Sequence, residues 1–278
     1  MILFPDDSPF LLTDTRKNRW AIPYSPECLN SRIEILLEQN RDCIQGKRIL
    51  DIGSHIGTFS YAALKLGAKF VHGIDTEADT VKRCHDLFRE QKVAESDYRF
   101  EVADVTEFLK NLPDNFYDTI FCFGTLYYLD EPLSLLKQMN RVGRKAVLLD
   151  TFTAGYAAVQ GKDSVKVFSS IQKATLDLPL MIVSLTKPGK GDYRLPKSFD
   201  FRGKNLSQIT LPTKSLLEIW YQSIGMGFKL LDWSHYIQGQ CSYEDLAKPG
   251  QKASSHWADV YASEIRVAYR LQPSEIPA

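Results

Sequence analysis

The chain of 278 residues lacks the features of a membrane-spanning, secreted or strongly charged protein. No stretch approaches the ~20 apolar residues that span a bilayer. The first residues, MILFPDDSPFLLTD, have proline and acids where a secretory signal has a basic start and an apolar run. The formal net charge is +0, so no overall field favours nucleic acid or an anionic membrane. We therefore expect a soluble cytoplasmic protein with a small-molecule substrate in preference to nucleic acid, no membrane partner, and an undetermined oligomeric state.

Cysteine is scarce as well. The five cysteines are odd in number, scattered and never arranged as C-x-x-C, whereas disulfide frameworks and zinc sites need paired or regularly spaced cysteines. His235, Cys241 and His256 lie near one another in the sequence without the spacing of metal ligands. We therefore expect reduced thiols and no metal.

Short apolar runs alternate with helical patterns between residues 47 and 150. Five strands are predicted, in the runs RILDIG, FVHGID, YRFEVAD, YDTIFCFG and KAVLLDTF. The helical patterns include GTFSYAALKLGA, EADTVKRCHDLFREQK and EPLSLLKQMNRV. Strands that alternate with helices form a parallel sheet covered on both faces, and such sheets bind ligands at the carboxyl ends of their strands. The sequence therefore predicts an α/β core over 47–150.

The remaining segments flank this core. Residues 1–46 predict an N-terminal cap with one helix, CLNSRIEILLEQN. Residues 151–212 break the alternation and predict an inserted lid or substrate segment, in which 187–204, KPGKGDYRLPKSFDFRGK, has the composition of a loop. Residues 213–278 predict a helix, TKSLLEIWYQSIGMGF, followed by two strands that complete the sheet.

The stretch ILDIGSHIGTF, residues 49–59, is the most informative of the chain. It combines a strand that ends in an acid with a glycine turn and a helix. Gly53 and Gly57 form G-x-x-x-G, not the G-x-G-x-x-G of a dinucleotide site, and no Gly-Lys-Ser/Thr follows. A ligand without phosphate needs no further glycine, but it still needs close approach to the backbone. The turn therefore suits a nucleoside ligand that has no phosphate.

Three acids follow three successive strands. Asp51 ends the first strand and could meet an ammonium group, and Asp75 ends the second, at the spacing expected of a ribose-binding carboxylate. Asp104 follows the third strand, where an acid could meet an adenine amino group. Each acid alone is more often a helix cap or a turn residue. Their joint placement at one sheet edge favours a single extended ligand.

The stretches ILDIGSHIGTF, GID, VADV and YDTIFCFGTLYYL resemble the class I S-adenosylmethionine-dependent methyltransferases. The resemblance covers residues 47–150 well and the final helix and strands more loosely. It implies a doubly wound, seven-stranded, Rossmann-like sheet with an antiparallel last strand, and S-adenosyl-L-methionine as the cofactor. His55 stands where the family usually has glycine. Histidine tolerates a positive φ better than a β-branched residue does, so we expect the turn to survive.

Within the family, FCFGTLYYLDEPLSLL resembles the branch that contains the tRNA wobble-uridine carboxymethyltransferase. That branch has a glycine-x-leucine-tyrosine run in the same loop, which Gly124, Leu126 and Tyr127 match. Tyr128 departs from the histidine that is common at its position. The resemblance implies that Tyr127 contacts the methionine carboxylate of the cofactor.

The strand ends and the resemblance together predict the site residues. The expected cofactor-binding residues are Asp51, Gly53, Ser54, His55, Gly57, Thr58, Phe59, Asp75, Thr76, Asp104, Val105, Phe123, Gly124 and Tyr127. Tyr24, Tyr127 and Tyr156 are expected at the reacting centre, since electron-rich ring faces stabilise a cation such as a sulfonium by ~0.5–2 kcal/mol. Tyrosines at such positions are also common packing residues.

The leading hypothesis is methyl transfer to a small molecule, in specialised metabolism. Three alternatives stay open: modification of a tRNA wobble uridine, a cyclisation or lyase reaction that consumes S-adenosylmethionine, and a regulator that binds it without turnover. Lys187, Lys190, Arg194 and Lys197 could meet RNA phosphates, although a solvated loop is the more common role of such a run.

Overall fold

The computed structural model describes residues 3–12, 24–159, 172–187, 198–238 and 256–274. The strands are β1 (Arg48–Ile52), β2 (Phe70–Asp75), β3 (Tyr98–Val102), β4 (Tyr117–Phe123), β5 (Gly143–Phe152), β6 (Met181–Thr186), β7 (Phe199–Phe201), β8 (Lys204–Pro212), β9 (Met226–Leu230) and β10 (Arg266–Pro273). The α-helices are α1 (Pro26–Leu36), α2 (Thr58–Lys65), α3 (Ala78–Glu90), α4 (Val105–Lys110), α5 (Pro132–Val142), α6 (Ala154–Val159), α8 (Lys173–Leu176), α9 (Lys214–Ser223) and α11 (Asp259–Ala262). The 3₁₀ turns are η1 (Glu38–Cys43), η2 (Glu95–Asp97) and η3 (Leu126–Tyr128). None of the described helices is long and apolar enough to cross a membrane.

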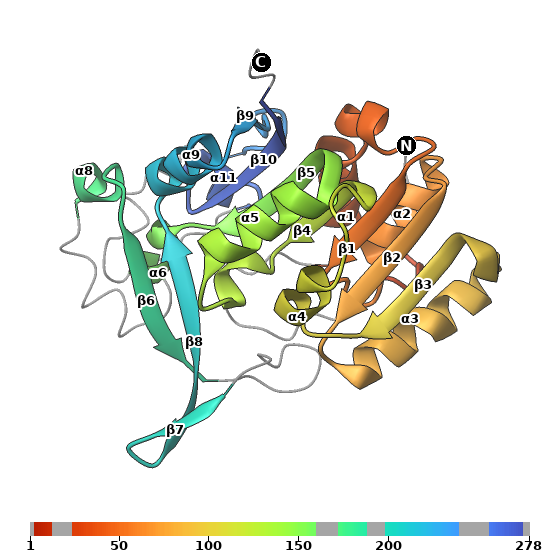
Figure 1. Cartoon of the computed structure of the whole chain (residues 1–278), viewed down its shortest axis with the longest axis horizontal. Helices are drawn as coiled ribbons and strands as arrows, with labels where there is room; N and C mark the ends of the chain where they lie inside the picture. The colour runs from red at the N-terminus through yellow and green to blue at the C-terminus, as the bar shows by residue number, and fades with distance from the viewer. Residues whose placement is uncertain (1–2, 13–23, 160–171, 188–197, 239–255, 275–278) are drawn as a thin grey trace.

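Seven strands form the central sheet, in the order β3-β2-β1-β4-β5-β10-β9 (Figure 1). Strands β1 to β5 pair in parallel, and β10 runs antiparallel to both of its neighbours. This confirms the predicted doubly wound sheet with an antiparallel last strand. The strand order reverses at β1 and β4, which is where an open sheet of this kind leaves a crevice for a ligand.

Both faces of the sheet are hydrophobic. Successive side chains of a strand point to opposite faces, and in the central strands both sets are apolar and buried. Ile49 of β1 and Phe121 of β4 pack among residues of α1, α2 and α3, whereas Leu50 and Ile120 pack among residues of α4, α5 and α9. The two clusters fix the helices on opposite faces. The carboxyl ends of β1, β2 and β4 are thereby held at one edge.

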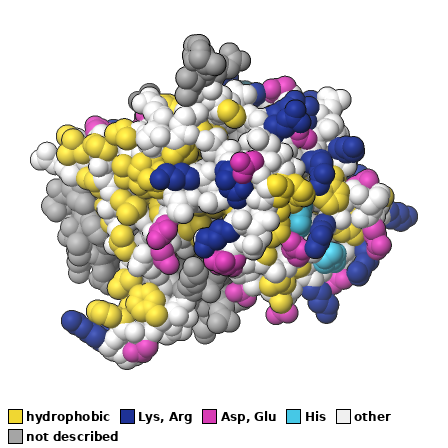
Figure 2. Space-filling view, in the orientation of Figure 1, with side chains coloured by type: hydrophobic (Ala, Val, Ile, Leu, Met, Phe, Trp, Pro, Cys, Tyr) yellow, Lys and Arg dark blue, Asp and Glu magenta, His cyan; other side chains and the backbone are white. Residues whose placement is uncertain are grey.

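A second, antiparallel sheet follows the core, in the order β6-β8-β7, and it projects away from the central sheet (Figure 1). A loop is predicted for 187–204. This prediction is wrong for the described residues at its end, because Phe199–Phe201 forms a strand that pairs with β8. Arg202 and Gly203 both have positive φ, as a two-residue hairpin turn of type I′ requires. Arg-Gly lacks the usual Asn-Gly signal, and the strand has only three residues. Hydrophobic side chains gather at the tip of this hairpin (Figure 2), where Phe199 and Phe201 are exposed.

One buried carboxylate joins three segments that are distant in sequence. Asp150 of β5 accepts hydrogen bonds from Arg32 of α1 at 2.7 Å and from Arg266 of β10 at 2.7 and 2.9 Å. The hydroxyl of Tyr261 in α11 donates to the same carboxylate. Asp150 is fully buried, and both arginines are 4% exposed. This ion cluster fixes α1 and β10 against the carboxyl end of β5.

We expect Asp150→Asn to destabilise the fold strongly. The substitution keeps the shape of the side chain but leaves two buried guanidiniums without a counter-charge, which costs about 3–5 kcal/mol. Denaturant unfolding of the variant and the wild type measures the loss. A change within 1 kcal/mol would show that water or another group already compensates the arginines.

Candidate functional site

The turn between β1 and α2 has three residues with positive φ. They are Gly53 at 66°, His55 at 51° and Gly57 at 77°. The backbone N–H groups of Gly53 and Ser54 both donate to the carbonyl of Ile74 in β2, at 2.9 and 3.0 Å. A side chain at Gly53 would collide with Thr125 of the neighbouring loop. The turn is therefore held tightly at the end of β1, and only glycine fits at this contact.

Asp75, at the end of β2, is oriented by the same turn. Its Oδ2 accepts a hydrogen bond from the N–H of His55 at 3.0 Å, and its Oδ1 accepts one from the N–H of Glu77 at 3.1 Å. Asp75 is partly buried and Thr76 beside it is exposed. Because a carboxylate can accept about four hydrogen bonds, acceptor capacity remains for the two hydroxyls of a ribose.

Asp51 is buried, whereas the other two acids at the strand ends, Asp75 and Asp104, are only partly buried. Its side chain is 3% exposed and accepts a hydrogen bond from the Ser60 hydroxyl of α2 at 2.7 Å. Burial raises the pKa of Asp51 to about 7, the Ser60 bond opposes the shift, and the charge of Asp75 adds to it. An ammonium group near Asp51 would favour its ionised form.

Asp104 caps a helix. Its Oδ1 accepts from the N–H groups of Thr106 and Glu107, at 2.9 and 3.3 Å, so it forms the N-cap of α4. Val105, the first residue of that helix, is buried. A helix cap is the more common role for an acid at such a position. Because Oδ1 accepts both cap bonds, a ligand could contact Asp104 only through Oδ2.

The loop after β4 closes the next part of the edge. Gly124 has a φ of 79°, and its N–H donates to the carbonyl of Asp150 at 2.7 Å. A Cβ at Gly124 would lie 3.5 Å from both the Tyr127 hydroxyl and Nη2 of Arg266. Thr125 donates to the carbonyl of Ile52 at 3.1 Å. This loop therefore connects the glycine turn to the ion cluster on β5.

Aromatic rings line the same edge in two groups. Tyr127 lies 4.3 Å from Tyr128 and 5.2 Å from Phe152 between ring centroids, and Tyr156 stacks on Phe152 at 4.1 Å. Tyr24 lies apart from these contacts, 5.5 Å from the ring of His55. The structure thus brings Tyr127 and Tyr156 together through Phe152 and places Tyr24 over the glycine turn.

Phe59 and Thr58 begin α2 directly after the turn, and both are buried. The ring of Phe59 lies 4.9 Å from that of Phe123 at the end of β4, and the guanidinium of Arg32 lies 4.7 Å above it. The predicted site residues at the ends of β1 and β4 therefore meet the ion cluster here.

The sequence reasoning missed Arg32, Asp150 and Arg266. Asp150 is a fourth acid near the end of a strand, directly opposite Phe123 in the register of β4 and β5, and that pattern was visible in KAVLLDTF. Arg32 stands within an otherwise apolar helix face, which is also unusual. Only the fold shows that the three residues meet.

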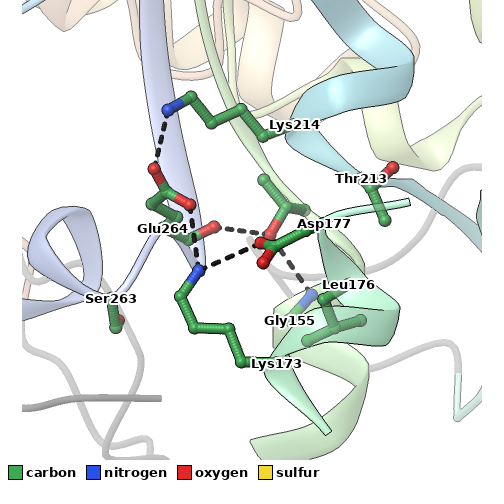
Figure 3. A pocket seen from close by; sticks show the side chains of 9 residues that line it. Gly155, Lys173, Leu176, Asp177, Thr213, Lys214, Ser263 and Glu264 are labelled. Carbon is green, nitrogen blue, oxygen red and sulfur yellow. Dashed lines mark hydrogen bonds and ion pairs between the residues drawn. The ribbon is translucent and has the colours of Figure 1, made fainter. Parts of the chain in front are cut away.

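A small polar hollow beside β10 is a separate feature (Figure 3). Lys214 and Lys173 both reach Glu264, at 2.6 and 3.5 Å, and Lys173 also reaches Asp177 at 3.2 Å. None of the predicted cofactor residues lines this hollow. Its charges neutralise one another, so it is a joint between the second sheet and the core. Among the described residues no group of three metal-ligating side chains occurs.

Part of the chain is similar to known proteins. Residues 45–159 match a protein family described as a methyltransferase domain. The tRNA U34 carboxymethyltransferase of Campylobacter hominis is 30% identical over 139 residues, which are 48% of this chain and 44% of that protein. That of Sulfurimonas denitrificans is 29% identical over 151 residues, 53% of this chain and 49% of that protein. The chain thus spans about half the length of the curated relatives it matches.

A solved structure, the N-terminal domain of EvdMO1 with SAH bound, aligns with a TM-score of 0.55 at 15% identity, over 86% of this chain and 79% of that one. At this identity the likeness concerns the fold. It confirms the predicted Rossmann-like sheet, and the family match over residues 45–159 agrees with the predicted resemblance to methyltransferases.

We expect His55→Gly to be tolerated and His55→Val to be damaging. At a φ of 51° glycine is unstrained, whereas a β-branched residue adds to a strain of about 1–2 kcal/mol. Both variants keep the N–H that donates to Asp75. Unfolding free energy and affinity for S-adenosylhomocysteine should therefore fall only in the valine variant. Loss of turnover in a His55→Gly protein that still binds the ligand would instead give the imidazole a chemical role.

We expect Asp75→Ala to weaken S-adenosylhomocysteine binding by about 1.5–3 kcal/mol, the range for hydrogen bonds to a charged group. Because the carboxylate also accepts two backbone N–H groups, some stability should be lost as well. Thr213→Ala is the matched control, since it removes the N-cap of α9, away from this edge, with a cost of about 0.5–2 kcal/mol. Calorimetry that finds full affinity in a folded Asp75→Ala protein would refute the ribose assignment.

We expect the stability of the protein to depend on pH through Asp51. Its folded pKa is about 7, above the ordinary value of about 3.9, so the folded state binds the proton more tightly than the unfolded state. The contribution of Asp51 to the free energy of unfolding is then largest at low pH. It falls as the pH rises from about 4 to about 7, by at most about 1.4 kcal/mol per pH unit. Asp51→Asn should remove this slope. If the difference in unfolding free energy between the wild type and Asp51→Asn does not change with pH, the raised pKa of Asp51 is contradicted.

Proposed function

We propose that the chain, through the methyltransferase domain of residues 45–159, transfers the methyl group of S-adenosyl-L-methionine to a small acceptor. The observation that carries this proposal is the edge formed by β3, β2, β1 and β4. It offers, in spatial order, Asp104, Asp75, the glycine turn and the Gly124 loop. This order matches the adenine, ribose and methionine parts of one extended ligand.

The cofactor would lie with its ribose hydroxyls on Asp75 and its methionine part over the turn from Gly53 to Gly57. Asp75 is suited to this because two backbone N–H groups already fix its carboxylate. Preorganised groups lose little further freedom when the ligand binds. The sulfonium would then face the loop after β4.

The acceptor side supports a small substrate. Tyr127, Phe152 and Tyr156 form a continuous aromatic wall beside that loop. Methyl transfer is an in-line displacement from the sulfonium, so the protein acts mainly by aligning donor and acceptor and by excluding water. Aromatic faces contribute to both, because they stabilise the sulfonium cation and leave little room for solvent.

A second candidate is modification of the wobble uridine of tRNA. It is favoured by the curated relatives, which are named tRNA U34 carboxymethyltransferases, and by the Gly124-Leu126-Tyr127 pattern. The neutral net charge weighs against it. Of the basic residues suggested for RNA phosphates, Lys190, Arg194 and Lys197 lie outside the described residues, and Lys187 is exposed directly after β6.

Product analysis tests the proposal. The protein is incubated with S-adenosylmethionine alone, with a small-molecule extract, and with total tRNA, and the products are identified by mass spectrometry. We expect a methylated small molecule together with S-adenosylhomocysteine in the second reaction only. Modified uridine in the third would establish the tRNA candidate, and a fragment of the methionine chain in the first would establish a lyase or cyclisation.

The salt dependence of turnover separates the two acceptor classes. Each phosphate contact with RNA adds to the slope of log affinity against log salt, so an RNA substrate gives a steep fall between about 50 and 200 mM salt. For a small acceptor we expect turnover to change less than about threefold over this range. A steep fall, flattened when Lys187, Lys190, Arg194 and Lys197 are neutralised together, would overturn the small-molecule proposal.

A further inference from the structure

The ion cluster at the end of β5 contains more positive than negative charge. Arg32 and Arg266 both contact Asp150, and all three side chains are at least nine-tenths buried. Burial opposes ionisation of Asp150, but Arg266 and Arg32 hold the pKa of this carboxyl below its ordinary value. The cluster therefore consists of two guanidinium ions and one carboxylate.

No other described group near the cluster supplies the missing negative charge. Burial raises the pKa of the Cys28 thiol to about 12, and it also raises the pKa of the Tyr261 hydroxyl, so both groups are neutral at physiological pH. Glu27 is an exposed side chain that bonds to His256. A buried cation without a counter-ion is costly, and such an excess is seldom retained without a purpose.

Hydrogen bonding gives the same result. Asp150 accepts one bond from Arg32, two from Arg266 and the bonds from Tyr261, which occupies the acceptor capacity of a carboxylate. Among the described residues, the only hydrogen bond that Arg32 makes is the one from Nη2 to Asp150. Its Nε is completely buried, and among the described residues no acceptor reaches it. An arginine has five donors, so this guanidinium is able to bind another oxyanion.

Arg32 lies close to the edge of the sheet at which the cofactor is proposed to bind. Its guanidinium lies above the ring of Phe59, the second residue of α2, which contacts Phe123 at the end of β4. Arg266 lies over Phe152 on the other side of Asp150 and approaches Gly124. The cluster thus lies two strands beyond the glycine turn and directly beside the loop after β4, where the methionine end of the cofactor and the acceptor would meet.

We propose that Arg32, oriented by Asp150 and Arg266, binds one carboxylate of the reacting ligands, and that this carboxylate supplies the negative charge that the cluster lacks. This inference rests on the proposed function. Two ligands can provide the group: the methionine part of S-adenosylmethionine, or an acceptor that is itself a carboxylic acid. In both cases Arg32 fixes the ligand relative to the sulfonium.

The first arm of the test compares two cofactor fragments by calorimetry. S-adenosylhomocysteine has the methionine-type carboxylate, and 5′-methylthioadenosine lacks it. The variant is Arg32→Met, which keeps the Asp150–Arg266 pair and the length of the side chain. Arg270→Met is the matched control, since Arg270 lies on β10 and makes an equally short bidentate pair with exposed Asp42.

The second arm examines the acceptor. With S-adenosylhomocysteine bound, and also without it, thermal stability is measured in the presence of benzoate or of neutral benzamide. Arg32→Lys is included because it keeps the charge but loses the planar fork, so its behaviour lies between wild type and Arg32→Met if Arg32 binds an oxyanion. Circular dichroism verifies the fold of each variant.

The two sources give different results. If the cofactor supplies the carboxylate, Arg32→Met weakens S-adenosylhomocysteine binding by about 10- to 100-fold and leaves methylthioadenosine binding unchanged. If the acceptor supplies it, S-adenosylhomocysteine binding is unchanged and stabilisation by benzoate, absent with benzamide, disappears in Arg32→Met. Arg270→Met should match the wild type in both arms.

Equal behaviour of Arg32→Met and wild type in both arms would overturn the carboxylate site and leave the proposed function intact. Failure of the wild type to bind either nucleoside would instead refute the proposed function. The benzoate measurement on the ligand-free protein then still decides whether Arg32 binds a carboxylate.

Discussion

The architecture of this site depends on the burial of one carboxylate between two guanidiniums. Asp150 joins α1, β5 and β10, which are separated by more than a hundred residues in the sequence. Water cannot replace these bonds at a fully buried position. The positions of the three elements relative to one another therefore depend on the same ion cluster. The ends of β4 and β5 and the start of α2 are consequently fixed relative to one another, and these are the elements between which a cofactor and an acceptor would react.

Local patterns in the sequence were sufficient for the central sheet and for the form of the glycine turn. The alternation of apolar runs with helical periodicity determines a doubly wound sheet, because few other arrangements bury strands on both faces. The turn at Gly53, His55 and Gly57 was also predictable, since glycine and histidine permit the positive φ that the structure shows at all three. These features depend on neighbours within about twenty residues.

Features that depend on distant pairing were not predictable in the same way. The hairpin of β7 and β8 is stabilised by its pairing with β6, and its Arg202-Gly203 turn gives only a weak local signal. Arg32 and Arg266 could not be assigned to Asp150, because nothing local shows which buried charges meet. The acids at the strand ends were recognised, but their hydrogen bonds were not. Asp104 proves to be a helix cap, and Asp51 proves to be buried against Ser60.

Asp75 shows why the roles of fold and ligand are difficult to separate at this edge. Its carboxylate accepts the N–H of His55 and so stabilises the left-handed turn, while it keeps acceptor capacity for the ribose of the proposed cofactor. A bound ribose would restrain the same carboxylate, and hence the turn over which the methionine part is expected to lie. Binding at one end of the cofactor would thereby favour the geometry needed at the other. This coupling requires no movement of the sheet, only a carboxylate shared between the backbone and the ligand.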